Sequence, residues 1–162
     1  MPETGKAGYE FLRHTLATLA YRAGKVLRGT PDGFAEFRVA PTTRTPGEIL
    51  AHLCDLLDWT LHLCAGRHVW QDSPPREWEE DANRFFEGLR RIDEHLVSGV
   101  LLGCSAERLF QGPVADALTH VGQIAMLRRV FGAPIRGENY FKADICSGSV
   151  GPQQTPGRFE FD

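Results

Sequence analysis

Between residues 78 and 96, apolar side chains recur at alternating steps of four and three positions, and this spacing constrains the fold more than any other feature. The positions are Trp78, Ala82, Phe85, Leu89, Ile92 and Leu96. This period places them on one face of an α-helix and is typical of a seam packed against antiparallel neighbouring helices. The chain is therefore predicted to form a bundle helix that begins near Pro75 or Arg76.

Three further segments show helical periodicity, at about residues 7–27, 46–64 and 113–131. In the first of them, apolar residues at steps of three and four form one face from Leu12 to Val26. Pro31 and Gly33 follow and are expected to stop this helix. Together with the segment at 78–96, the pattern predicts an all-α protein with four helices.

Two of these helices also carry boundary signals. Thr45 is a suitable N-cap, Pro46 suits the first turn, and Glu48 completes a T-x-x-E capping box. At the other end of the chain, Gly132 and Pro134 are expected to end the helix that begins at Pro113. These signals predict the second and fourth helices more firmly than periodicity alone.

The connections are long and rich in breakers. Phe37 and Val39 alternate with polar residues in "FAEFRVAPTTRTP", which allows a short extended piece within a long first crossover loop. The last stretch, 135–162, is rich in Gly, Pro and polar residues and is predicted to be irregular, with Tyr140 and Phe141 available to pack it on the bundle. We therefore expect a single domain, 1–162, that combines a four-helix bundle with a C-terminal extension.

Composition excludes several classes of protein. The 162 residues are enough to bury a core without disulfides, and the net charge of -3 argues against a nucleic-acid binder. No apolar run of about 18 residues predicts a membrane span, and the N-terminal segment lacks the apolar core of a signal peptide, so we expect a cytoplasmic protein.

The four cysteines show neither a C-x-x-C motif nor zinc-finger spacing. Free thiols are the simplest interpretation, with Cys54 and Cys64 in the core; a nucleophilic cysteine is the alternative.

Three polar residues interrupt the otherwise apolar fourth helix. Asp116, His120 and Gln123 follow one another at i, i+4 and i+7, so they lie along one stripe. A buried carboxylate without a partner is very costly. The stripe therefore requires solvent in a cleft, a cation or a metal ion beside it.

The second helix offers a matching histidine. His52 lies among apolar residues, and if the second and fourth helices are adjacent it can meet Asp116 and His120. Two imidazoles and one carboxylate form a plausible divalent metal site with open coordination positions. The alternatives are a hydrogen-bonded core histidine and a simple intrahelical Asp–His pair. Asp58 and His62 have the same spacing on a polar face, where a solvated pair is expected.

The stretches "TPGEILAHLCDLLDW" and "DALTHVGQIAMLRR" resemble the DinB-like superfamily, which includes the YfiT-like proteins. The resemblance implies an up-down-down-up four-helix bundle and a divalent ion held by three histidines. His52 and His120 match two of these ligands, whereas Asp116 stands where the family has the third histidine. The resulting two-His-one-carboxylate set suits nickel or zinc, and also iron or manganese. Gln123 matches the family's glutamine and is expected to support the site as a second-shell residue.

The resemblance also implies a function. Known activities of the superfamily are mostly metal-assisted transfers of small thiols such as bacillithiol or mycothiol, and other members are described as metal-dependent hydrolases. We therefore expect a metal-dependent thiol transferase or hydrolase that acts on a small molecule, with no nucleic-acid or membrane partner. A homodimer is expected as well, because members of the superfamily often pair through their bundle faces. The alternative is a non-catalytic, metal-free helical module that binds a ligand or responds to stress. The sequence assigns no catalytic residue.

Overall fold

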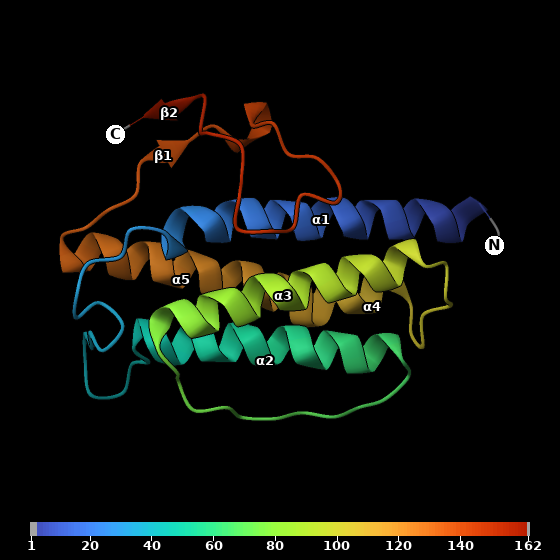
Figure 1. Ribbon diagram of the computed structural model, residues 1–162, viewed down its shortest axis with the longest axis horizontal. Coiled ribbons are helices and arrows are strands. Elements are labelled where there is room, and N and C mark those ends of the chain that lie inside the picture. Colours follow the sequence, from blue (N-terminus) through green and yellow to red (C-terminus); the bar gives the residue numbers. More distant parts are fainter. Residues whose placement is uncertain (1–2, 162) are drawn as a thin grey trace.

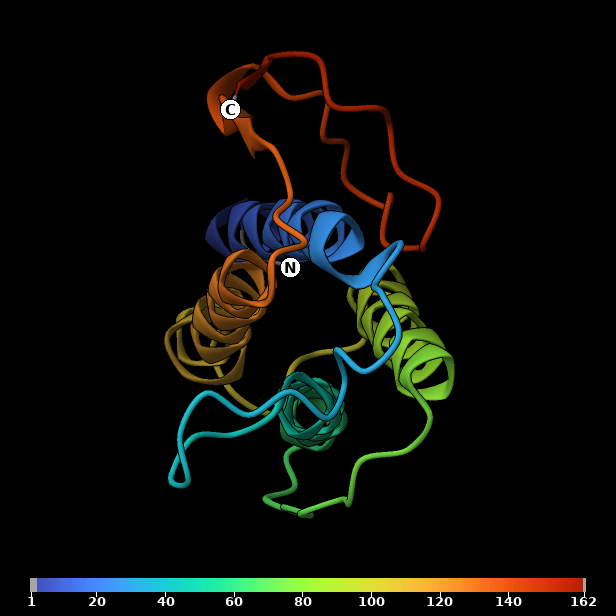
Figure 2. The same ribbon diagram turned by 90° about the vertical axis from the view of Figure 1, so that its left-hand side faces the viewer.

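The computed structural model describes residues 3–161, with side chains from residue 6 onward. Four long helices of this part of the chain form a bundle, which confirms the predicted all-α fold (Figures 1 and 2). They are α1 (Glu3–Leu27), α2 (Pro46–Cys64), α3 (Trp78–Val97) and α5 (Ala115–Phe131). Viewed along the bundle in Figure 2, α1 and α2 lie at opposite corners, with α3 and α5 between them on either side.

The helices α2 and α3 run in the same direction. Cys54 Sγ donates a hydrogen bond to the carbonyl of Asp81 near the start of α3. At the other end of both helices, the Gly103 amide donates to the carbonyl of Cys64. Helices α1 and α5 run the opposite way, so the order along the chain is up, down, down, up (Figure 1). The seam of α3 therefore faces one parallel and one antiparallel neighbour, and not antiparallel neighbours alone.

The crossover lies in a different connection from the one that was predicted. Residues 28–45 join α1 to α2 at the same end of the bundle, whereas residues 65–77 run back along its length from the end of α2 to the start of α3 (Figure 1). The first loop consists of turns and bends, so the extended piece expected around Phe37 and Val39 does not form. Phe37 packs edge-on against the ring of Phe131 at the end of α5 instead, with the ring centroids 5.0 Å apart.

Helix α2 begins where its sequence signals predict. The Thr45 side chain accepts a hydrogen bond from the Glu48 amide at 3.1 Å, and the Glu48 carboxylate accepts one from the Thr45 amide at 2.7 Å. Both halves of the capping box are therefore formed, and Pro46 occupies the first turn, where no intrahelical donor is needed. Such a cap contributes about 1 kcal/mol and fixes the register of the helix that carries His52.

The fourth helix, α5, begins at Ala115, close to the predicted start at Pro113, and a short helical segment that was not predicted precedes it. After α3 the chain becomes helical again at α4 (Ala106–Leu109), capped by Ser105, and it continues through a π-helical segment η1 (Phe110–Val114) into α5. Gly112 has non-helical torsions (φ -91°, ψ -106°) directly before Pro113, which has no amide hydrogen to donate. This kink joins two helices that periodicity alone reads as a loop followed by a helix.

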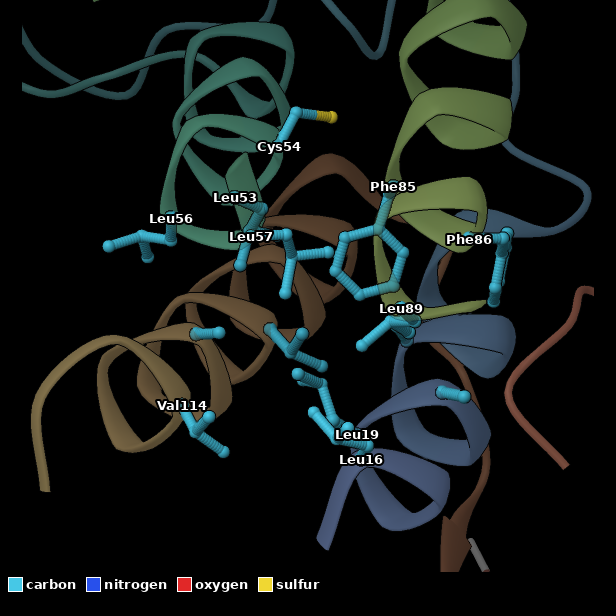
Figure 3. Close-up of a cluster of buried hydrophobic side chains, with 14 of the residues drawn as sticks. Leu16, Leu19, Leu53, Cys54, Leu56, Leu57, Phe85, Phe86, Leu89 and Val114 are labelled. Carbon is cyan, nitrogen blue, oxygen red and sulfur yellow. The ribbon is translucent and has the colours of Figure 1, made fainter. Parts of the chain in front are cut away.

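All four helices contribute to one apolar core, and Figure 3 shows its centre. Leu16 and Leu19 of α1, Leu53 of α2, and Phe85 and Leu89 of α3 are fully buried there. A buried side chain of this size contributes roughly 1.5–3 kcal/mol relative to leaving it exposed. The predicted face of α3 is thus the observed one. The four cysteines are free thiols, as expected, with Cys54 and Cys64 buried.

The C-terminal extension folds back over the outer side of α1 (Figure 2). It is irregular apart from the 3-10 turn η2 (Tyr140–Lys142) and the paired strands β1 (Gly137–Glu138) and β2 (Glu160–Phe161). Tyr21 donates a 2.7 Å hydrogen bond to the buried Glu138 carboxylate, and Lys25 binds both Glu138 and Glu160 at 2.8 Å. A buried polar network therefore holds the extension to α1. Tyr140 packs against the ring of Tyr21, but Phe141 is exposed and does not pack on the bundle as expected.

Over the described residues, none of the helices combines the length and the apolar character that crossing a membrane requires.

Candidate metal centre

The three predicted ligand residues meet between α2 and α5. His52 lies midway along α2, and Asp116 and His120 lie one turn apart near the start of α5. One ligand atom from each residue lies within 4.8 Å of the others. The structure therefore brings together the two-His-one-carboxylate group that the sequence predicted, from helices that run in opposite directions.

Asp116 is the centre of this group. Its Oδ2 lies 3.6 Å from Nε2 of His52, and its Oδ1 lies 3.4 Å from Nδ1 of His120. The two imidazole rings are 4.7 Å apart, centroid to centroid, at an angle of 55°. The two carboxylate oxygens therefore face one imidazole each.

The backbone orients the His120 ring. Its Nδ1 lies 2.9 Å from the carbonyl oxygen of Asp116, one helical turn earlier. A carbonyl oxygen accepts only, so Nδ1 carries a hydrogen and Nε2 is the ring nitrogen that is left to face a ligand. A hydrogen bond from one imidazole nitrogen to a carbonyl is the usual arrangement that presents the other nitrogen to a metal.

The electrostatic environment favours the neutral form of His52 by lowering its pKa. Burial lowers the pKa of His52, and the charges of Arg44 and His120 lower it further, while Asp116 opposes them. A neutral imidazole is the form that binds a metal.

The site is partly open to solvent. The Asp116 side chain is 45% exposed, whereas the side chains of His52 and His120 are 16% and 12% exposed.

An aromatic side chain from the crossover covers one side of the site. The Trp70 ring meets the His52 ring edge-on at 5.6 Å and the Trp59 ring at 5.7 Å. Residues 66–75 lie between two predicted helices and show no helical periodicity in the sequence. An aromatic residue in a loop has no periodicity to reveal its contacts, so no signal in the sequence identified Trp70.

Two clefts flank the group and share Arg44. The first, of about 470 Å³, has a largely apolar wall that includes Ile49 and Leu127 and opens beside His120. The second, of about 300 Å³, opens beside His52. It is more polar than the first, with a lining that includes Glu48, Asp55, Asp72 and Ser73. The exposed Gln123 lines the first cleft together with His120, so it lies toward solvent rather than in the core.

Asp58, the acidic residue of the other Asp–His pair in α2, has a structural partner. Asp58 binds Arg84 of α3 at 2.7 Å, so the expected solvated pair with His62 is wrong. Arg84 also binds the buried Asp55, whose carboxylate accepts two further hydrogen bonds from Ser73 in the crossover. These contacts hold the crossover against α2 and α3.

The buried cysteines are poor nucleophiles. Burial raises the pKa of Cys64 to about 12 and raises that of Cys54 further. Because the thiolate is the reactive form, neither side chain is available for covalent chemistry near neutral pH. Burial also raises the pKa of the half-buried Cys104, while nearby Arg108 opposes that effect.

No protein-family model, curated protein or solved structure matches this chain. The likeness to the DinB-like superfamily therefore stays a prediction from two short motifs. The chemistry that the site can support therefore follows from its own donors, distances and clefts.

Proposed function

We propose that the protein binds a divalent metal ion through His52, Asp116 and His120 and acts on a small molecule at that ion. The observation that carries this proposal is the convergence of three donors from two helices within 4.8 Å. The hydrogen bond that orients the His120 ring and the lowered pKa of His52 support it further, because the first leaves Nε2 of His120 to face an ion and the second favours the neutral imidazole that coordinates a metal.

The donor set narrows the choice of ion. Imidazole favours nickel and zinc, and a set of two histidines with one carboxylate also suits iron and manganese. Three protein ligands with an exposed carboxylate are typical of catalytic rather than structural sites, which are closed by four protein ligands. An ion held there supplies Lewis acidity, which favours deprotonation of a thiol or a water and polarises a carbonyl.

The surrounding residues support a small substrate with an anionic group. Arg44 lines both flanking clefts, so its guanidinium is placed to bind a carboxylate or phosphate on either side of the metal group. Ile49 and Leu127 offer an apolar wall to the rest of the molecule. Trp70 shields His52 from solvent on the side of the crossover. Together with the resemblance described above, these features favour transfer of a small thiol or hydrolysis.

One observation favours a second candidate, a metal-free module that binds a ligand without catalysis. The Asp116 carboxylate already lies near both imidazoles, so protonation of one histidine would let the three residues satisfy one another without an ion. In that case the two clefts beside His52 and His120 would bind a ligand without a metal ion and without catalysis.

Metal content distinguishes the two candidates. The protein is purified without added metal, analysed by mass spectrometry for bound ions, stripped with a chelator and titrated with zinc, nickel and manganese by calorimetry. The proposal expects binding of one ion per chain, which His52→Ala abolishes and His14→Ala preserves, because His14 is an exposed histidine of α1 outside the site. A screen for thiol transfer and ester or amide hydrolysis follows with the loaded protein. Failure of the stripped protein to take up any of the three ions would favour the metal-free module.

A further inference from the structure

A third cleft, of about 470 Å³, lies beside the last turns of α2. This end of the helix is on the right-hand side of Figure 1. Its walls come from the last turns of α2, the start of the crossover, the loop after α3, and the α4–η1 segment. His52, Asp116 and His120 do not line it. Its volume lies within the range that proteins use for small-molecule sites.

This cleft is positively charged, although the protein carries a net charge of -3. Arg67 and Arg108 line it, and none of the described residues in its lining is acidic. Most arginines elsewhere bind carboxylates, as Arg13 binds Asp93 and Arg84 binds Asp55. Within residues 6–161, neither Arg67 nor Arg108 forms an ion pair. Both arginines therefore line this concave surface without an ion-pair partner among the described residues, and Arg67 also lines a neighbouring cleft that contains Asp55 and Asp58.

The cleft has a fixed frame. Gly66 and Gly103 pack backbone to backbone so closely that a Cβ on Gly103 would lie 2.2 Å from Gly66. The Gly103 amide also donates a 2.8 Å hydrogen bond to the carbonyl of Cys64. The loop after α3 is therefore held against the end of α2, and the residues on both sides of the contact keep their places in the wall.

One wall is aromatic. Trp59 lines the cleft together with His68, and their rings meet edge-on at 5.4 Å. An indole face offers a flat apolar surface that favours the ring of a bound molecule. Gln111 and the thiol of Cys104 complete the polar part of the lining.

We infer that this cleft is a binding site for a small anionic molecule that carries a ring, with Arg67 and Arg108 binding a carboxylate or phosphate and Trp59 contacting the ring. Guanidinium groups are well suited to both anions because their donors match two oxygens at once. The site is separate from the metal centre and does not depend on the proposed function.

Cys104 provides a built-in reporter of occupancy. It is the half-buried thiol of the cleft, whereas Cys54 and Cys64 are buried and Cys146 is exposed. In metal-free full-length Cys146→Ser protein, iodoacetamide should modify Cys104 selectively, and mass spectrometry gives the rate. Phenyl phosphate or benzoate should slow this reaction at least about fivefold at saturation. Comparison of the two probes assigns the anionic group.

Matched variants test the residues in this assignment. Arg67→Gln with Arg108→Gln should weaken protection by the preferred probe at least about tenfold, because two charge-assisted contacts are lost. Arg129→Gln, an exposed arginine of α5, and His52→Ala should leave it unchanged. Circular dichroism confirms that each variant is folded.

Three results would overturn the inference. They are the absence of protection by either probe, equal protection by neutral benzyl alcohol, and unchanged affinity in the double arginine variant. Equal binding of inorganic phosphate and phenyl phosphate would overturn the assignment to a ring-bearing molecule.

Discussion

His52 of α2 and His120 of α5 lie with their rings 4.7 Å apart, and the carboxylate of Asp116 reaches both of them. The two histidines come from helices that are far apart in sequence and run in opposite directions. Their meeting depends on the capping box that fixes where α2 begins and on the helical segment that leads into α5. Variants of Asp116 and of Trp70 test whether this meeting of the two histidines forms a metal site.

Replacing Asp116 tests whether it is a ligand. Asp116→Ala should lower the affinity for divalent ions by at least the roughly 10–100-fold that loss of even a second-shell partner causes. Asp116→His should retain binding and shift preference from manganese toward nickel or zinc, because imidazole suits those ions better than a carboxylate does. Calorimetric titration of the stripped proteins measures both effects. Equal affinities in wild type and both variants would remove Asp116 from the site.

Trp70 should report metal binding by its fluorescence. Its ring contacts His52, so quenching by a nickel ion at that histidine should lower its emission. In Trp70→Phe most of this change should disappear, although Trp59 and Trp78 remain. Trp78 lies in α3 and donates its indole N–H to the carbonyl of Leu27, away from the site, so Trp78→Phe is the control. An undiminished nickel response in Trp70→Phe would place the ion elsewhere.

Much of the fold follows from sequence because burial imposes periodicity. The seam from Trp78 to Leu96 and the capping box at Thr45 each determine a local structure. The direction in which neighbouring helices run, and the course of the loops that connect them, leave no such periodicity in the sequence. A period of 3.6 is the same for parallel and antiparallel neighbours, so the parallel packing of α2 and α3 could not be predicted from it. Gly112 and Pro113 mark the boundary before α5 as expected, but the short helix α4 on their other side shows no periodicity that could have predicted it.

The candidate site was predictable for a related reason. His52, Asp116 and His120 are polar residues on apolar faces, and a polar group in such a place requires a partner. The partners that come from loops were not predictable. Trp70 and Arg44 reach the site from connections whose course depends on tertiary contacts, such as those that Asp55 makes with Ser73.

Glu138 should make stability depend on pH in the acidic range. Burial alone would raise the pKa of Glu138, but hydrogen bonds from Lys25 and Tyr21 outweigh it and lower the pKa. A carboxyl whose pKa is lower in the folded state stabilises the fold above its unfolded pKa of about 4.3, and that contribution is lost as the pH falls through the folded value.

Glu138→Gln tests this dependence. At pH 7 it should lower the free energy of unfolding by about 3 kcal/mol, since it leaves Lys25 without one partner of a buried pair. The difference from wild type should begin to shrink as the pH falls below about 4.3, because Glu138 becomes protonated in the unfolded chain, and it should be lost below the lowered pKa that Glu138 has in the folded protein. Urea unfolding across this pH range measures it, and Glu36→Gln in the exposed first loop is the control. A difference that stays constant with pH would contradict the ion-pair explanation.

Arg128 should prove structural rather than substrate-binding. Its buried guanidinium donates hydrogen bonds to the carbonyls of Val26, Arg28 and Gly29 at the end of α1 and of Ala133 beyond α5. Arg128→Leu keeps much of the apolar stem but leaves these acceptors without their donor, and each one left unsatisfied in a buried position costs about 1–3 kcal/mol. We expect a loss of at least about 3 kcal/mol in the free energy of unfolding, measured with urea, and unchanged zinc affinity in the folded protein. The neighbouring exposed Arg129→Leu should change neither quantity. The opposite result would be an unchanged free energy of unfolding in Arg128→Leu together with weaker binding of the metal or of an anionic substrate. That result would place Arg128 in the functional site and would show that the carbonyls at the ends of α1 and α5 do not depend on its guanidinium.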